Sequence, residues 1–317
     1  MANIKQKAIY FPYTFFQGKV IKTEDAKVSI MTNALQYGTA VFAGIRGYYN
    51  DNNGKPFISV FRIKDHYERF TNSFKIIGVK IPYSRDELVE ITLNLLKKNN
   101  PKTDTYIRPF GYAGSINLSP NLERDNLFDV SIYMIPLGEY LPVDKGIATG
   151  VSSWRRVSDN AIPARAKISG SYINSALARK EATDHGYAEA IFLTEDGHVA
   201  EGSAENIFIV RNGVLITPSA TDEVLEGITR RSILEIAQSL GLPTEIRSID
   251  RSELYIADEA FFCGTGVQIS WISSVDKRVV GNGKRGPLTS VIQDLFFDIV
   301  RGKKDIGKDW ITKIYVK

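Results

Sequence analysis

The sequence has little cysteine, little histidine and no long apolar run, and each shortage excludes a class of protein. Its one cysteine, Cys263, cannot form an intramolecular disulfide, which is typical of a reducing compartment, so we expect a cytoplasmic location. Its three histidines are far apart in the sequence and no second cysteine joins them, so we expect no metal site. No segment approaches the roughly 18 uninterrupted apolar residues of a membrane span.

The charge is also nearly balanced. There are 40 basic and 36 acidic residues, and this excess over 317 residues is too slight to indicate a nucleic-acid-binding protein. A hydrophobic content of 43% and a charged content of 24% are typical of a soluble globular protein. The length is sufficient for two domains that each bury a core.

The chain mixes helical and strand patterns and predicts an α+β protein. Between Met134 and Lys145, two prolines and a glycine disfavour both a helix and a central strand. We therefore predict a small domain over 1–133, a linker over 134–145 and a large domain over 146–317. Predicted helices are 64–77, 84–97, 172–185, 233–240 and 288–300; predicted strands are 8–11, 14–21, 45–49, 57–63, 105–112, 128–135, 147–153, 188–193, 206–210, 214–217, 257–263 and 269–275. The lysine-rich tail over 303–317 is predicted to be solvated surface.

Lys167 and Glu201 are the first candidates for chemistry. A lysine forms an imine with an aldehyde only when its amine is unprotonated, so its pKa must be lowered by burial or by a nearby cation. Arg156 and Arg165 supply positive charge nearby in the sequence. Glu201 ends a predicted strand, where its carboxylate can keep a pyridine nitrogen protonated. Taken alone, Lys167 would more often be a surface lysine and Glu201 a member of a surface ion pair.

Two neighbours extend this pair. Tyr172, five residues beyond the lysine, can hydrogen-bond a phenolic oxygen, although a core-facing tyrosine is the commoner case. Glu205 competes with Glu201 for the pyridine nitrogen, and we expect it to be structural.

Two small-residue turns predict a seat for a phosphate. Gly227-Ile228-Thr229 opens a helix, whose first backbone amides attract anions, and Gly264-Thr265-Gly266 follows a strand. Arg69 on another helix can complete this seat, although an exposed arginine is more common there. Neither turn fits a dinucleotide fingerprint or a Walker A motif. An amine, a carboxylate and a phosphate seat are what a pyridoxal phosphate enzyme needs.

Tyr106 and Arg108 predict where a substrate binds. Alternate residues of a strand share a face, so both side chains point the same way, and a guanidinium there can hold a carboxylate. Tyr37 and Phe42 would add an apolar wall, but ordinary core positions explain them equally well.

Together these motifs resemble those of the branched-chain amino acid aminotransferases of fold type IV. The likeness runs nearly end to end, through Tyr37-Gly38-Thr39, Gly44-Ile45-Arg46, Tyr106-Ile107-Arg108-Pro109, Lys167, Glu201-Gly202, Glu205-Asn206, Gly227-Ile228-Thr229-Arg230 and Gly264-Thr265. The resemblance implies a small α/β domain and a larger domain with a pseudo-barrel of strands flanked by helices. It implies pyridoxal 5'-phosphate held by Lys167, Glu201, Tyr172, Leu225, Arg69, Ile228, Thr229 and Thr265.

The resemblance also implies a substrate site. Tyr106 and the amides of Gly266 and Val267 would meet the α-carboxylate, Arg108 the distal carboxylate of glutamate, and Tyr37 and Phe42 the side chain. The family is at least dimeric, with the partner subunit completing the pocket. Ala43 and Leu137 depart from its pattern, because many relatives have glutamate and some have a bulky aromatic at these positions.

The function implied is transamination of L-leucine, L-isoleucine and L-valine with 2-oxoglutarate in branched-chain amino acid biosynthesis. Alternatives within the same fold are a D-amino acid aminotransferase and an aminodeoxychorismate lyase, and the Tyr-Ile-Arg strand speaks against both. A non-catalytic anion or nucleic-acid binder is an alternative of another class.

Overall fold

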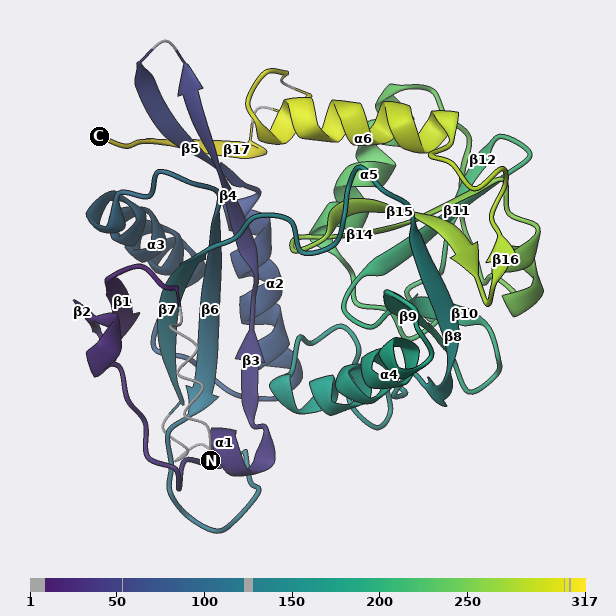
Figure 1. Ribbon diagram of the computed structural model, residues 1–317. Helices are drawn as coiled ribbons and strands as arrows, with labels where there is room; N and C mark the ends of the chain where they lie inside the picture. Colours follow the sequence, from purple (N-terminus) through teal and green to yellow (C-terminus); the bar gives the residue numbers. More distant parts are fainter. Residues whose placement is uncertain (1–8, 53, 123–127, 305, 308) are drawn as a thin grey trace, which may run out of the picture.

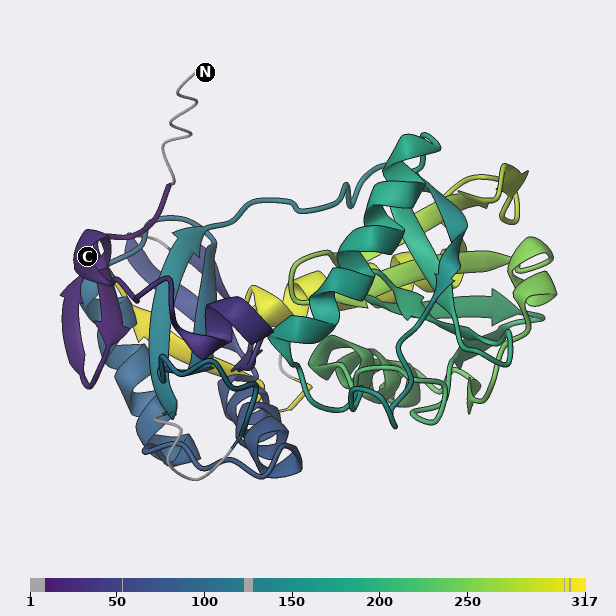
Figure 2. The same cartoon turned by 90° about the horizontal axis from the view of Figure 1, so that it is seen from below.

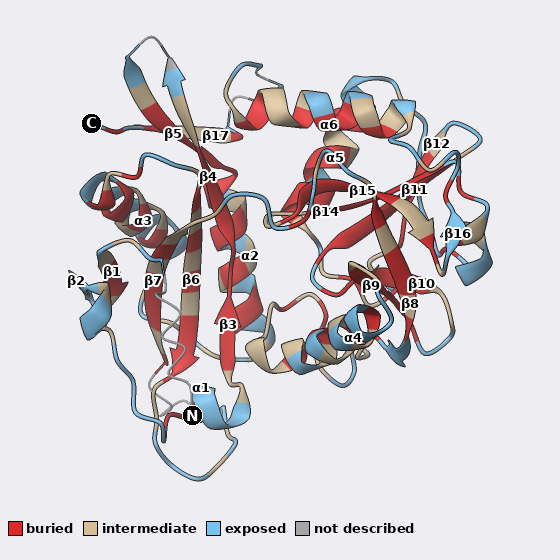
Figure 3. Cartoon of the chain, viewed as in Figure 1, coloured by how far each residue is buried: buried red, intermediate tan, exposed pale blue. Residues whose placement is uncertain are grey.

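The computed structural model describes residues 9–52, 54–122, 128–304, 306–307 and 309–317. Two sheets with their own helices lie side by side and are joined by an extended segment (Figures 1 and 2). The α+β prediction is confirmed. Figure 3 shows that buried residues concentrate in the strands of both sheets and on the inner sides of the helices.

The first sheet has eight strands in the order β17-β5-β4-β6-β7-β1-β2, with β3 paired to β6, and all neighbours are antiparallel. Helices α2 and α3 bury Phe70, Phe74 and Leu88 against it. The predicted capping box of α3 is present, with Ser84 and Glu87 bonded to each other's backbone. The bounds are β1 Tyr13–Phe16, β2 Lys19–Lys22, α1 Asn33–Tyr37, β3 Ala40–Phe42, β4 Ile45–Asn52, β5 Lys55–Phe61, α2 Ile63–Ile76, α3 Arg85–Asn99, β6 Thr105–Ala113, β7 Phe128–Pro136 and β17 Ile311–Tyr315.

The second sheet has nine strands in the order β10-β9-β8-β15-β14-β11-β12-β13, with β16 paired to β15. Its pairs are mixed, since β8 runs parallel to both β9 and β15. The bounds are β8 Ile147–Arg155, α4 Tyr172–Asp184, β9 Glu189–Leu193, β10 Val199–Gly202, β11 Asn206–Arg211, β12 Val214–Thr217, α5 Ile228–Ser239, β13 Thr244–Ile246, β14 Glu259–Gly264, β15 Gln268–Val275, β16 Arg278–Val279 and α6 Pro287–Val300.

Alternate residues of β11 belong to different cores. Ile207 and Ile209 pack in a cluster formed mostly by the strands, whereas Phe208 and Val210 pack with α5 and α6. This period of two is what a sheet buried on both faces requires. The strands therefore surround one core and carry helices outside it, as the resemblance implied.

Strand β7 continues to Pro136 and β8 starts at Ile147, so the segment between the two sheets overlaps most of the linker predicted over 134–145. Helix α1 and strand β3 were not predicted. The predicted strand over 8–11 is absent for residues 9–11, and its first residue lies outside the described residues.

The C-terminal tail differs from its prediction as solvated surface. After α6 the chain returns to the first sheet, and β17 pairs antiparallel with β5 (Figure 1). Trp310 is buried, with Arg62 4.6 Å from its ring centroid. Residues 311–315 thus belong to the first sheet although they fall within the large domain predicted over 146–317. The division into domains stays a proposal. In the part of the chain that the structure describes, no helix has the length and apolarity to cross a membrane.

Candidate active site

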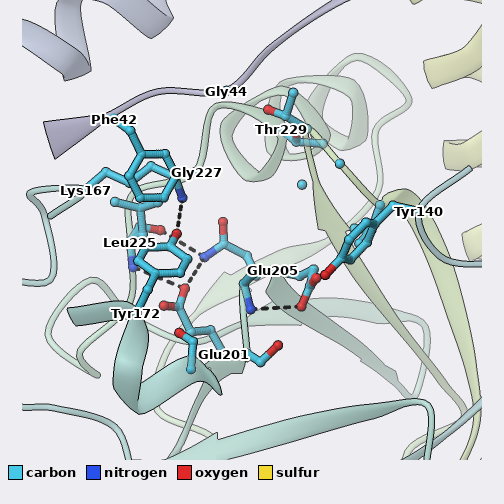
Figure 4. A pocket seen from close by; sticks show the side chains of 18 of the residues that line it. Phe42, Gly44, Tyr140, Lys167, Tyr172, Glu201, Glu205, Leu225, Gly227 and Thr229 are labelled. Atoms are coloured by element: carbon cyan, nitrogen blue, oxygen red, sulfur yellow. Dashed lines mark hydrogen bonds between the residues drawn. The ribbon is translucent and has the colours of Figure 1, made fainter. Parts of the chain in front are cut away.

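A cavity of about 480 Å³ opens where β3 and β6 of the first sheet face α4, α5 and the strand ends of the second (Figure 4). Its lining includes every predicted site residue except Tyr37. Tyr37 lies on α1 and is 38% exposed, so the chain by itself does not bring it to the cavity. The predicted residues that it brings together are Phe42, Arg69, Tyr106, Arg108, Lys167, Tyr172, Glu201, Leu225, Ile228, Thr229, Thr265, Gly266 and Val267.

Lys167 is held at the cavity wall by its backbone. Its carbonyl accepts a hydrogen bond from the Phe42 amide at 3.0 Å, and its own amide donates to Ser73 Oγ at 3.3 Å. Its Nζ donates to Tyr172 Oη at 2.5 Å. Burial, together with the nearby Arg69 guanidinium, lowers the pKa of Lys167 to about 7. About half of the amine is therefore unprotonated at pH 7 and available as a nucleophile or base.

Glu201 has both carboxylate oxygens occupied. Arg156 Nη2 lies 3.0 Å from Oε1, while Asn206 Nδ2 and the Leu225 amide donate to Oε2 at 3.0 and 3.2 Å. Burial raises the pKa of Glu201, and the charges of Arg156 and Lys167 oppose that rise. The carboxylate is thus fixed in position (Figure 4).

The roles of Arg156 and Asn206 were missed in the sequence. Arg156 was considered only as a charge near Lys167, and Asn206 only as part of a motif. The signal for Asn206 was its place five residues after Glu201 beyond a tight turn, while nothing local indicated that Arg156 would reach Glu201.

The residues predicted to bind a phosphate line the same cavity and come from α5, from α2 and from the turn after β14, where Thr265 lies. Helix α5 begins at Ile228 after Gly227, and Thr229 is buried at its first turn. A Cβ at Gly227 would lie 1.9 Å from Asn206 Oδ1, so only glycine permits this approach. Arg69 of α2 reaches across to the Glu226 carbonyl at 3.2 Å. Together they place helix-terminal amides, a hydroxyl and a guanidinium at one end of the cavity, which suits a phosphate.

Phe42, Tyr106 and Arg108, three of the residues predicted to bind substrate, line the cavity together. Tyr106 and Arg108 both face the cavity from β6, and Arg108 Nη2 donates to Tyr106 Oη at 3.1 Å. The Arg108 guanidinium carbon lies 4.4 Å from the centroid of the Phe42 ring. A Cβ at Gly44 would be 2.0 Å from Tyr106 Oη, so glycine there makes room for the tyrosine.

Ala43 and Leu137, the two residues that differ from the family pattern, lie in different parts of the structure. Leu137 lines the cavity, whereas Ala43 packs in the core of the first sheet with Val41 and Ile45. Ala43 therefore does not form the cavity wall itself.

Comparisons with known proteins show which family this chain resembles. The family model of amino-transferase class IV matches residues 40–275. A probable branched-chain-amino-acid aminotransferase of Aquifex aeolicus is 45% identical, covering 98% of this chain and 99% of that protein. The branched-chain aminotransferase of Thermoproteus uzoniensis, solved with norvaline, has a TM-score of 0.89 at 43% identity, covering 96% and 100%. The branched-chain amino acid aminotransferase of Thermobaculum terrenum in its PLP form has a TM-score of 0.90 at 36% identity, covering 96% and 98%.

Proposed function

Since this chain belongs to the class IV aminotransferases, we propose that it transfers the amino group of L-leucine, L-isoleucine or L-valine to 2-oxoglutarate, giving branched-chain 2-oxo acids and L-glutamate. The observation that carries this proposal is the stacking of Arg108 on Phe42 beside Tyr106. An apolar ring and a cation share one wall, and a pocket that alternates between aliphatic and acidic side chains needs both.

The residues of the cavity fit pyridoxal phosphate, the cofactor of this class. Lys167 offers an amine, Glu201 a fixed carboxylate for the pyridine nitrogen, and the start of α5 a seat for the phosphate. Bound there, the cofactor supplies an electron sink that stabilises negative charge at the substrate α-carbon. Leu225 lies in the same lining and provides apolar surface for the ring.

Lys167 is proposed to move the proton at the substrate α-carbon. Its Nζ is positioned by Tyr172 Oη and is deprotonated above a pKa of about 7, so it can accept that proton near neutral pH and return it. Burial raises the pKa of Tyr172, which keeps its hydroxyl protonated as a hydrogen-bond donor for the phenolic oxygen of the cofactor.

The pKa of Lys167 predicts how the apoenzyme captures its cofactor. Because the neutral amine attacks the aldehyde, and the pKa is lowered from 10.5 to about 7, capture should accelerate about tenfold from pH 6 to pH 8 and change little above that. Stopped-flow absorbance with added pyridoxal phosphate measures this rate. A rate that continues to rise up to pH 10 would mean that the amine keeps the pKa of an ordinary lysine.

The α-carboxylate of the substrate is proposed to bind Tyr106 and the amides of Gly266 and Val267. Arg46 holds this turn in place, because its Nη1 donates to the Gly266 carbonyl at 3.1 Å. Its Nη2 donates to the carbonyls of Leu137 and Gly138, so one buried side chain of the first sheet fixes both the turn and the linker.

We further propose at least a dimer, in which the partner completes the pocket and Tyr37 reaches a substrate side chain. Exposed apolar residues near α1 support this, since Ile30, Leu35 and Leu118 are 83%, 65% and 81% exposed. A cytoplasmic location fits the single cysteine, which is buried and not paired.

Arg108→Ala separates the two substrate classes. We expect the KM for 2-oxoglutarate and L-glutamate to rise about 10- to 100-fold, because a charge-assisted contact is lost, while the KM for L-leucine changes far less. Steady-state assays of both half-reactions measure this. Damage confined to L-leucine would reject the assignment of Arg108.

The substrate class itself is tested with the unmodified protein. L-Leucine, L-isoleucine and L-valine should all serve as donors to 2-oxoglutarate, with D-alanine and aminodeoxychorismate as the comparison substrates. Faster turnover of either comparison substrate would replace the proposed function with the corresponding alternative.

A further inference from the structure

The cavity contains a second buried glutamate, Glu205, that the proposed chemistry does not use. It follows Glu201 by four residues, is only 3% exposed, and lines the cavity (Figure 4). Its Oε2 accepts a hydrogen bond from the Ala204 amide at 3.0 Å. One backbone amide is weak compensation for a buried negative charge.

A third acid, Glu189 of β9, lies close to Glu205 and is completely buried. Arg179 of α4 forms an ion pair with Glu189 Oε2, and the Ala190 amide donates to its Oε1 at 2.7 Å. The Arg179 guanidinium thus forms its ion pair with Glu189 and acts on Glu205 only through its charge. Two neighbouring carboxylates that are both ionised and both buried cost much free energy. We therefore expect one proton to stay on Glu205.

The electrostatics agree with this placement of the proton. Burial and the neighbouring Glu189 raise the pKa of Glu205 to about 8, with Glu201 adding to the rise and Arg179 opposing it. Glu205 is therefore expected to be a neutral carboxylic acid at pH 7, able to donate a hydrogen bond.

The linker residue Tyr140 faces this group. Figure 4 shows its hydroxyl end directed toward the Glu205 carboxyl group, and Glu205 and burial both raise the pKa of that hydroxyl. Arg179 hydrogen-bonds the same hydroxyl, and its guanidinium carbon lies 5.9 Å from the ring centroid. The other side of Tyr140 meets the turn that holds the substrate carboxylate, since a Cβ at Gly266 would be 3.9 Å from its Cγ.

We propose that Glu205, a buried carboxylic acid next to the Glu189–Arg179 ion pair, positions Tyr140 and thereby the linker wall of the substrate pocket. The inference rests on the proposed function, because it concerns the site for the substrate carboxylate and side chain. The groups that face Glu205 are Glu189 from β9, Arg179 from α4, Glu201 from β10 and Tyr140 from the linker. Glu205 is a positioning residue that acts through Tyr140, and its ionisation would loosen this wall.

Glu205→Gln tests the proposal, since glutamine has nearly the shape of the protonated acid and cannot ionise. In the holoenzyme at pH 7 we expect a KM for L-leucine within about twofold of the unmodified value. Between pH 7 and pH 9.5 the KM of the unmodified enzyme should rise about tenfold more than that of Glu205→Gln. The amine of leucine titrates identically in both assays, so it cancels from this ratio.

Two further variants complete the test. Glu205→Ala removes the donor and should raise the KM about tenfold already at pH 7. Glu181→Gln is the matched control, because Glu181 lies on α4 like Arg179 but bonds Ser152 and Ser153 away from the cavity, and it should leave the pH profile unchanged. If Glu205→Gln is as impaired as Glu205→Ala at pH 7, or shares the pH profile of the unmodified enzyme, the proposal is wrong.

Thermal unfolding gives a readout that needs no substrate. The folded pKa of Glu205 lies above its unfolded value near 4.5, so its contribution favours folding at low pH and is lost between about pH 4.5 and pH 8. Glutamine cannot ionise, so Glu205→Gln does not lose stability in this way. The Tm of Glu205→Gln minus the Tm of the unmodified protein should therefore increase from about pH 4.5 to pH 8 and stay constant above pH 8. A Tm difference that does not change with pH would contradict the inference that Glu205 is protonated. Absence of branched-chain transamination would instead overturn the proposed function alone.

Discussion

Lys167→Ala should lower the turnover number by about 10⁴-fold, because one side chain both captures the cofactor and moves the proton at the substrate α-carbon. Among the described residues, the cavity lining has no second lysine that could take over either role. Assays of both half-reactions measure the loss. Borohydride reduction followed by peptide mass analysis should find the cofactor on Lys167 in the unmodified protein and no such adduct in the variant.

A second lysine on a nearby helix provides the control for this experiment. Lys180 lies on α4, and its side chain is 72% exposed in an ion pair with Asp184. Lys180→Ala should keep full turnover and the borohydride adduct on Lys167. Turnover above about one hundredth of the normal rate in Lys167→Ala would remove the lysine from the proposed mechanism.

Some site residues could be predicted from the sequence because local backbone geometry determines where their side chains point. Tyr106 and Arg108 share a face because a strand has a period of two, and Thr229 meets the cavity because it opens a helix after a glycine. Lys167 and Glu201 were proposed together from their residue types and flanking sequence, and both line the cavity although the lysine precedes α4 and the acid lies on β10.

What could not be predicted depends on contacts between distant segments. Arg156 reaches Glu201 Oε1 from the end of β8, 45 residues earlier in the chain, whereas Asn206, which donates to Oε2, is only five residues away. Strand β17 reads Ile-Thr-Lys-Ile-Tyr, which has no clear apolar alternation, and its place in the first sheet depends on pairing with β5. Ala43 directly follows β3 and packs with Val41, two residues earlier, in the core of the first sheet.

The proton on the pyridine nitrogen depends on a negative charge at Glu201, and Glu201→Gln removes that charge while keeping the shape. Glutamine can still accept from Asn206 and the Leu225 amide, so the side chain should stay in place. We expect turnover to fall about 10²- to 10³-fold, the usual loss when one preorganised electrostatic contact disappears from an active site. Steady-state kinetics measures this, and Glu181→Gln, a change in an acid that bonds Ser152 and Ser153 outside the cavity lining, is the control with an expected normal rate.

Glu201→Gln also leaves the Arg156 guanidinium buried without its carboxylate, so part of any loss could come from a weakened fold. Glu201→Gln/Arg156→Met removes both charges and separates the two effects. The double variant should recover thermal stability relative to Glu201→Gln, since no unpaired charge remains, but it should not recover turnover. Recovery of turnover together with stability would show that Glu201 serves the fold, and that the electron sink of this enzyme does not depend on its charge.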